Sequence, residues 1–216
     1  MTGRLRFDLP DRIALFPLPG ALLLPRSRLP LQIFEPRYLQ MLNDVLKTEH
    51  RLIGMVQPID AKEGEAQALA PIGGAGRVVA FTETDDGRMM ISLQAISRFR
   101  LTEVEEGFAP YLQGRVEWQD FARDLKGPES DEDFDRGPFL EKLERFMEPR
   151  ELTTDWDAAA DAEDEMLINA LSMLLPFDPP EKQALLEAVT LTKRREMLEG
   201  LIDYALLSED SEERLQ

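Results

Sequence analysis

The stretch Ile13-Ala-Leu-Phe-Pro-Leu-Pro-Gly-Ala-Leu-Leu-Leu-Pro25, followed by Leu29-Pro-Leu-Gln-Ile-Phe-Glu-Pro-Arg-Tyr38, restricts how this chain can fold. Its prolines exclude a long helix, because proline lacks the N–H group that a helix interior needs. The apolar residues 13–16 are expected to form a short strand. A helix is expected to begin at Pro36, because proline suits the first helical turn, and Glu35 is expected to cap it.

Outward from this stretch, residues up to 120 predict further short strands. Residues 52–56 form an apolar run that indicates a buried strand. Residues 85–87 read Asp-Asp-Gly between two apolar segments, which indicates a hairpin, because Asp-Gly accepts the positive φ angles of a tight turn. The glycine-rich run 73–77 is expected to be a tight turn, since it lacks the Lys-Ser/Thr of a phosphate-binding loop. Short strands with one helix predict an α+β fold with a small closed or strongly curved sheet.

The composition changes near residue 120. Residues 1–120 read as a β-rich subdomain with one helix, residues 121–137 as an acidic linker, and residues 138–216 as a helical subdomain. The linker lacks the ligand spacing of an EF-hand, so we expect a solvated segment. In the helical part, Asp178 is expected to cap a helix, and Leu201 is expected to lie on the buried face of the last one.

The charge balance excludes several classes of partner and site. The 216 residues carry a net charge of −17, which repels phosphate backbones, so we expect no binding to nucleic acid. The absence of cysteine excludes disulfides, thiolate catalysis and thiolate-ligated metals. No signal peptide or membrane-spanning run is evident, so we expect a cytoplasmic protein without a membrane partner.

Catalytic motifs are missing. His50 is the single histidine, and no Gly-x-Ser-x-Gly elbow accompanies it. The sequence therefore predicts a protein that is not an enzyme and needs neither a cofactor nor a metal. Carboxylates are abundant, so a hydrolase built on a pair of them stays open as an alternative.

Apolar residues in loops and at strand surfaces are the candidates for peptide binding. They are Leu23, Leu24, Phe34, Met89 and Met90. Two consecutive methionines on a strand must face opposite sides, so one of the pair is expected to face outward and make adaptable contacts. The competing interpretation is that Leu24 and Phe34 plug the sheet.

Several motifs along the chain together resemble one family. They are residues 16–20 (Phe-Pro-Leu-Pro-Gly), 29–31, 34–38 (Phe-Glu-Pro-Arg-Tyr), 76–78, 97–101 (Ser-Arg-Phe-Arg-Leu), 174–177, 182–186 and 194–198. Their order and spacing, over residues 12–207, are similar to the Lon protease N-terminal (substrate-binding) domain family. The chain ends at Gln216 without the ATPase and protease domains, so the resemblance is to a stand-alone form.

The resemblance implies a PUA-like small β-barrel, or pseudobarrel, followed by a C-terminal helical bundle. It also implies a non-catalytic protein- or peptide-binding module, in the role of an adaptor or holdase for unfolded or extended polypeptides. The alternatives are the carboxylate-based hydrolase and a scaffold for one specific protein partner. The sequence does not determine the client or the oligomeric state.

Overall fold

The computed structural model describes residues 9–59, 68–105 and 107–213, with side chains as far as Ser208. The strands are β1 (Arg12–Pro17), β2 (Arg28–Ile33), β3 (Leu52–Val56), β4 (Pro58–Ile59), β5 (Ala68–Leu69), β6 (Ile72–Glu83), β7 (Met89–Glu105) and β8 (Gln113–Glu117). The α-helices are α1 (Pro36–Leu46), α2 (Arg136–Met147), α3 (Trp156–Asp161), α4 (Asp164–Leu174), α5 (Pro179–Glu187) and α6 (Leu191–Glu213). The predicted α+β class is confirmed.

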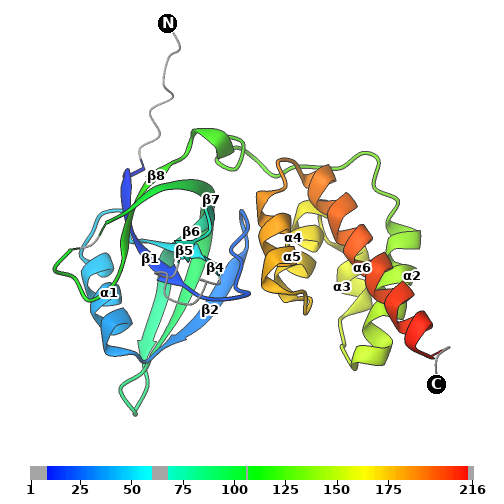
Figure 1. Cartoon of the computed structure of the whole chain (residues 1–216), viewed down its shortest axis with the longest axis horizontal. Coiled ribbons are helices and arrows are strands. Elements are labelled where there is room, and N and C mark those ends of the chain that lie inside the picture. Colours follow the sequence, from blue (N-terminus) through cyan, green and yellow to red (C-terminus); the bar gives the residue numbers. More distant parts are fainter. Residues whose placement is uncertain (1–8, 60–67, 106, 214–216) are drawn as a thin grey trace, which may run out of the picture.

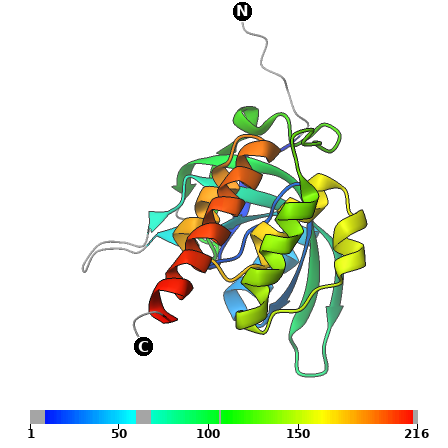
Figure 2. The same ribbon diagram turned by 90° about the vertical axis from the view of Figure 1, so that its right-hand side faces the viewer.

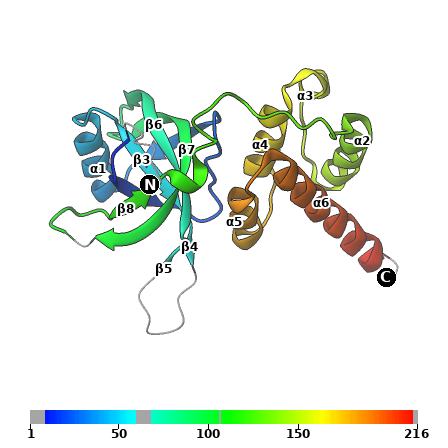
Figure 3. The same cartoon turned by 90° about the horizontal axis from the view of Figure 1, so that it is seen from above.

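The strands and α1 form one half of the molecule, and helices α2 to α6 form the other (Figure 1). Viewed from the helical side, the bundle lies in front of the sheet (Figure 2). From above, α6 runs obliquely across the bundle and its C-terminal part extends beyond the other helices (Figure 3). The elements of each half are consecutive along the chain, β1 to β8 with α1 in one and α2 to α6 in the other.

The main sheet is mixed. Its strand order is β2-β7-β6-β3-β1-β8, and β8 also pairs with β7. Strands β7, β6, β3, β1 and β8 are thus paired in a ring, and β2 is attached to its outside through β7. Only the β1–β3 pair among them is parallel. Because β8 returns to pair with β7, none of the five ring strands is a free edge over its whole length.

The glycine-rich run is part of strand β6, so the prediction of a tight turn at residues 73–77 is wrong. Gly74 pairs with Met55 on one side and Arg98 on the other. A Cβ atom at Gly74 would lie 2.0 Å from the backbone oxygen of Leu23. Position 74 therefore needs glycine because the backbone of Leu23 passes too close to β6 to leave room for a side chain.

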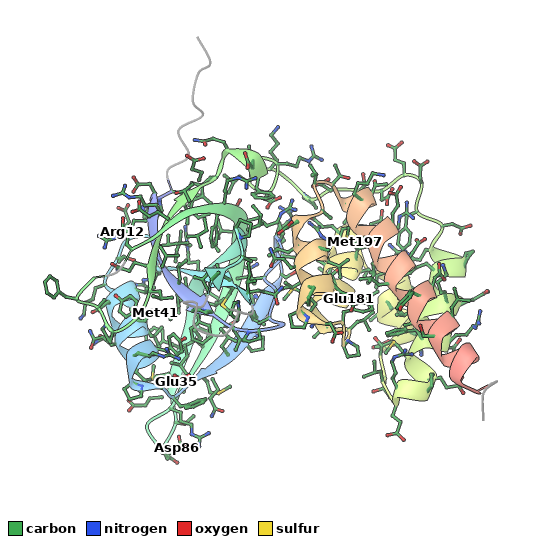
Figure 4. All side chains as sticks on the ribbon, viewed as in Figure 1. Arg12, Glu35, Met41, Asp86, Glu181 and Met197 are labelled. Carbon is green, nitrogen blue, oxygen red and sulfur yellow. The ribbon has the colours of Figure 1, made fainter. Side chains whose placement is uncertain are left out.

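The predicted hairpin is confirmed, with Gly87 at a φ of +77° between β6 and β7. Asp86 lies at its tip, where its carboxylate accepts a hydrogen bond from the hydroxyl of Thr84 (Figure 4). Helix α1 begins at Pro36 as predicted and buries Met41 against the sheet. Glu35, however, makes no side-chain cap, because its carboxylate pairs instead with the exposed guanidinium of Arg37 at 2.8 Å.

In the helical half, the predicted capping box is present. The backbone N–H of Asp178 donates to the carboxylate of Glu181 at 2.8 Å. The prediction for the last helix is partly wrong: Ile202 is fully buried, whereas Leu201 is half-buried at the edge of the cluster. A helix of 23 residues that continues past its neighbours can bury only a narrow stripe, so adjacent positions differ sharply in exposure.

The two halves share a hydrophobic core. Leu22, Leu24 and Ile72 come from the β half, yet they belong to the cluster that holds the buried residues of α2, α4, α5 and α6. Leu23, between the two leucines, belongs to a second cluster inside the β half. The extended segment 22–24 therefore lies between sheet and helices and sends alternate side chains into two cores.

Polar contacts attach the segment 121–137 to both halves. Asp124 is buried and accepts two bonds from the guanidinium of Arg98, at 2.8 and 2.9 Å. Asp131 is buried as well, and its carboxylate accepts from Arg195 at 2.6 Å. The prediction that the acidic segment 121–137 is solvated is therefore wrong at these two carboxylates, which are paired within the structure.

Candidate functional site

A cleft of about 580 Å³ opens on the β half, where the end of β1, the first turn of α1 and the β7–β8 connection meet. We call it the Pro–Tyr cleft. Its lining comprises Pro17, Pro19, Arg37, Tyr38, Pro58, Glu105, Gly107, Ala109, Pro110, Tyr111 and Leu112. Four prolines and two tyrosines make most of this wall, so rigid rings lie beside the charged side chains of Arg37 and Glu105.

The rim of this cleft exposes large apolar side chains. Phe108, between the lining residues Gly107 and Ala109, has a fully exposed side chain. Leu112 on the same connection is 36% exposed, and Ile59, next to Pro58, is 46% exposed. A fully exposed phenylalanine beside a cavity leaves apolar area in water that a bound chain could cover.

The two tyrosines differ in their hydrogen bonding. Both are more than nine-tenths buried, and burial raises the pKa of each hydroxyl. The Tyr111 hydroxyl donates to the carboxylate of Asp44 at 3.1 Å. The Tyr38 ring packs against Phe16 with 4.3 Å between centroids, and the guanidinium of Arg37 lies 4.5 Å above it. Tyr38 is thus held rigidly on the cleft wall.

Among the described residues that line the cleft, the one carboxylate is that of Glu105. Its oxygens pair with Arg12 at 2.7 Å and with Arg115 at 2.9 Å. Neutralised by two guanidinium groups, this carboxylate is not arranged as one of a catalytic pair. Among residues 9–59, 68–105 and 107–213, no group of three or more His, Cys, Asp or Glu side chains is placed to hold a metal ion.

The structure separates the five residues that the sequence singled out. Leu23 and Leu24 are almost completely buried, so their assignment to an exposed patch is wrong. The reason is the position of their segment between the sheet and the helices, with Leu23 against Gly74 and Gly76 and Leu24 against the helical core. The two neighbouring leucines pack into two different hydrophobic clusters. The sequence of the segment alone does not show that both sides of it are covered.

The other three residues lie together on the hairpin side of the sheet. Met90 is 42% exposed, and Met89 is half-buried against the core of the β half, so the two methionines face opposite sides as expected. Phe34 is 60% exposed, and its ring lies 5.8 Å from the guanidinium of Arg88. Phe34 and Met90 thus form a small exposed pair, which we call the hairpin patch.

Sequence reasoning missed the Pro–Tyr cleft. Its walls come from four separate segments, and their meeting depends on how the sheet closes. One local signal was available: residues 107–110 read Gly-Phe-Ala-Pro, an aromatic side chain in a segment that glycine and proline keep out of regular structure. Within the described part of the chain, no helix has the length and apolar character needed to cross a membrane.

Comparison with known families gives one match across most of the chain. The profile described as "ATP-dependent protease La (LON) substrate-binding domain" matches residues 12–203. The Lon protease of Phenylobacterium zucineum is 24% identical over 206 residues, which cover 91% of this chain and 25% of that protein. Lon protease 2 of Sorangium cellulosum is 28% identical over 111 residues, which cover 50% of this chain and 13% of that protein. The chain thus spans a quarter or less of the length of these relatives.

Two solved structures share the fold. A Lon N-terminal domain protein from Xanthomonas campestris superposes with a TM-score of 0.60 at 24% identity, over 87% of this chain and 96% of that one. The N-terminal domain of the Mycobacterium avium complex Lon protease superposes with a TM-score of 0.62 at 14% identity. The match covers 90% of this chain and 97% of that one. The sheet and the helical half are both included in matches of this extent.

Proposed function

Because this chain belongs to the family of ATP-dependent protease La (LON) substrate-binding domains, we propose that it is a non-catalytic module that recognises unfolded or extended polypeptides. Its role is that of an adaptor or holdase in the cytoplasm. The family description names substrate binding, and the solved relatives are N-terminal domains rather than proteolytic ones. These points support recognition of protein substrates.

The observation that carries this proposal is the Pro–Tyr cleft with its exposed rim. A cavity of about 580 Å³ is within the range of about 300–1,000 Å³ that is common for binding pockets. The paired state of Glu105 favours binding over carboxylate-based hydrolysis. Phe108 provides an aromatic anchor that can be covered by a client without any rearrangement of the core.

The hairpin patch is the second proposed contact surface. Phe34 and Met90 offer exposed aromatic and thioether groups, which adapt to varied apolar partners. Met89 supports them from the buried side of β7. Because the two surfaces lie on different parts of the β half, one extended client could contact both.

Recognition at the hairpin side is proposed to use side chains rather than strand addition. β2 is the outer strand there and pairs only with β7 in the described sheet. The N–H of Ala95 donates to the carbonyl oxygen of Ser27, so these two residues are a hydrogen-bonded pair of the antiparallel ladder. Hydrogen-bonded and non-hydrogen-bonded pairs alternate along such a ladder. Pro30, opposite Ser92, is therefore in a non-hydrogen-bonded pair, and its backbone N and C=O point away from β7. Since proline has no N–H, it removes a donor from the outward edge at that position and disfavours pairing with another strand.

The architecture of the β half is proposed to be a PUA-like pseudobarrel. The ring of β7, β6, β3, β1 and β8 supports this assignment. We place the subdomain boundaries at residues 1–120 and 138–216, joined by 121–137. The shared core at Leu22 and Leu24 implies that the subdomains keep a defined relative orientation, which a surface for client binding requires.

The test is the affinity for a permanently unfolded protein, reduced and carboxymethylated α-lactalbumin, measured by fluorescence anisotropy. Phe108→Ser should weaken binding on the order of tenfold, because covering one phenylalanine contributes about 1.5–3 kcal/mol. Phe34→Ser should also weaken binding. Val189→Ser is the matched control, since Val189 is 71% exposed, between Phe34 and Phe108, but lies on the helical half; the affinity of this variant should not change.

Each variant should keep the melting temperature of the parent protein, because all three side chains are largely exposed. Affinity that is unchanged by both Phe108→Ser and Phe34→Ser, or absent in the parent protein, would contradict the proposed function.

A further inference from the structure

The Pro–Tyr cleft has polar donor groups at the first turn of α1. Tyr38 is 7% exposed and belongs to the core of the β half, yet its hydroxyl has no hydrogen-bond partner among the described residues. Every fully buried side-chain nitrogen or oxygen of the described residues does have a partner. The Tyr38 hydroxyl must therefore reach solvent, and the cleft is the cavity that Tyr38 lines.

The first turn of α1 adds positive character at the same end. The side chain of Glu35 does not cap the helix, and the first turn contains no acidic residue. Arg37 lies in this turn and lines the cleft beside Tyr38. A helix N-terminus, a guanidinium and a hydroxyl donor are the groups that bind carboxylates and other oxyanions.

Two described carboxylates lie near this end, and each is paired with an arginine. Glu105 is held by Arg12 and Arg115. Glu35 pairs with Arg37, but both side chains are about half exposed, and an exposed pair of this kind contributes at most about 1 kcal/mol. An incoming carboxylate that also reaches the Tyr38 hydroxyl can therefore replace Glu35 as the partner of Arg37.

We propose that the Pro–Tyr cleft binds the free C-terminus of a client polypeptide, with the terminal carboxylate at Arg37 and Tyr38 and the last apolar side chains against the prolines and Tyr111. This inference rests on the proposed function and names the substrate class of the same site. The cleft places a guanidinium and a hydroxyl donor at the first turn of α1 beside proline and tyrosine rings, which suits a terminal carboxylate preceded by apolar side chains. Phe108 on the rim then covers the residues that precede the terminus.

The protonation states fit this arrangement. Burial raises the pKa of the Tyr38 hydroxyl above its usual value, so the hydroxyl keeps its proton at neutral pH and can donate. The terminal carboxylate of a peptide is ionised at the same pH. The bond between them is therefore charge-assisted, and its strength does not depend on any residue changing its protonation state on binding.

The experiment compares three fluorescein-labelled decapeptides that share one sequence ending in leucine and phenylalanine. The first has a free C-terminal carboxylate, the second is amidated, and the third is amidated and extended by one glutamate. Anisotropy titrations on the full chain should show the free acid binding about tenfold more tightly than the amide, because a hydrogen bond to a charged group contributes about 1.5–3 kcal/mol. The third peptide should bind like the amide.

Two substitutions assign the effect to the cleft. Tyr38→Phe removes only the hydroxyl and should abolish most of the difference between acid and amide, while the melting temperature stays unchanged. Arg37→Gln should reduce the same difference several-fold. Arg77→Gln is the control, because Arg77 is an equally exposed arginine on β6 that does not line the cleft, and it should leave the preference intact.

Equal affinity for the acid and the amide would overturn this inference while leaving polypeptide recognition in place. A glutamate-ended amide that binds as tightly as the free acid would overturn it too, in favour of a general carboxylate site. If no peptide and no unfolded protein binds, both the inference and the proposed function fail.

Discussion

Arg98 is a buried arginine whose guanidinium bonds to two parts of the chain. It is 1% exposed and makes a two-pronged contact with Asp124, and its remaining guanidinium nitrogen donates to the carbonyls of Leu186 and Ala188 on the helical half. Arg194 is likewise buried and donates to the side chain of Asn169 at 2.8 Å. The motif at residues 97–101 thus supplies an arginine that joins the two halves, whereas the arginine of the motif at 194–198 bonds within the helical half. Neither arginine lines the Pro–Tyr cleft.

At the residue scale, removal of the carboxylate that pairs with Arg98 should be strongly destabilising. Asp124→Ala leaves a buried guanidinium without its counter-charge, which should lower the free energy of unfolding by about 3–5 kcal/mol. Asp120→Ala is a close control, because Asp120 pairs at 2.6 Å with Arg100, two residues after Arg98 on β7, but both side chains are about half exposed. The control should cost at most about 1 kcal/mol. Urea denaturation measures both, and equal small losses would contradict the role given to Arg98.

At the element scale, helices of the bundle are fixed by their ends and by a narrow buried face. Helix α5 begins with the Asp178–Glu181 capping box and two prolines, which together satisfy and shield its first N–H groups. Helix α6 begins where the Thr190 hydroxyl accepts from the N–H of Lys193 at 3.2 Å. The prolines and caps set where each helix starts, while burial of residues such as Ile202 sets how it is rotated.

Capping and burial should therefore differ in their energetic effect. Asp178→Ala removes a cap and should lower the free energy of unfolding by about 1 kcal/mol. Ile202→Ala creates a cavity at a fully buried site and should cost about 2–5 kcal/mol, whereas the half-buried Leu201→Ala should cost less than Ile202→Ala. Denaturant melts of the three variants give the order. A larger loss for Leu201→Ala than for Ile202→Ala would show that the rotation of α6 is described incorrectly.

At the scale of the whole molecule, the negative charge is unevenly distributed. Residues 138–216 contain 20 Asp and Glu against 8 Lys and Arg, whereas residues 1–120 contain 16 against 14. The helical half therefore holds −12 of the total −17, and the β half, which carries the Pro–Tyr cleft, is nearly neutral. Clients of either charge can approach the cleft, while the helical half repels polyanions.

Duplex DNA and structured RNA should consequently bind poorly at physiological salt. Neither half offers the positive excess that would release counterions from a phosphate backbone. Fluorescence anisotropy with a labelled 20-base-pair duplex and with a hairpin RNA should give dissociation constants weaker than micromolar. A sub-micromolar affinity that falls steeply with added salt would reveal a basic surface that the charge balance hides.

The sequence alone determined the elements that depend on local chemistry. Pro36 starts α1, Gly87 turns the hairpin, and Asp178 with Glu181 caps α5, because each of these effects acts over only a few residues. The order of its motifs also indicated the family, which the match over residues 12–203 confirms. The opposite orientation of Met89 and Met90 followed from the two-residue period of a strand.

Only the tertiary structure decided which apolar and acidic side chains are exposed. Leu23 and Leu24 are buried because sheet and helices close over one extended segment, and Asp124 is buried because an arginine from β7 reaches it. The Pro–Tyr cleft likewise exists only once β1, α1 and the β7–β8 connection meet. Burial and cavities are properties of contacts between distant parts of the chain, so local patterns such as charge runs and apolar runs do not specify them.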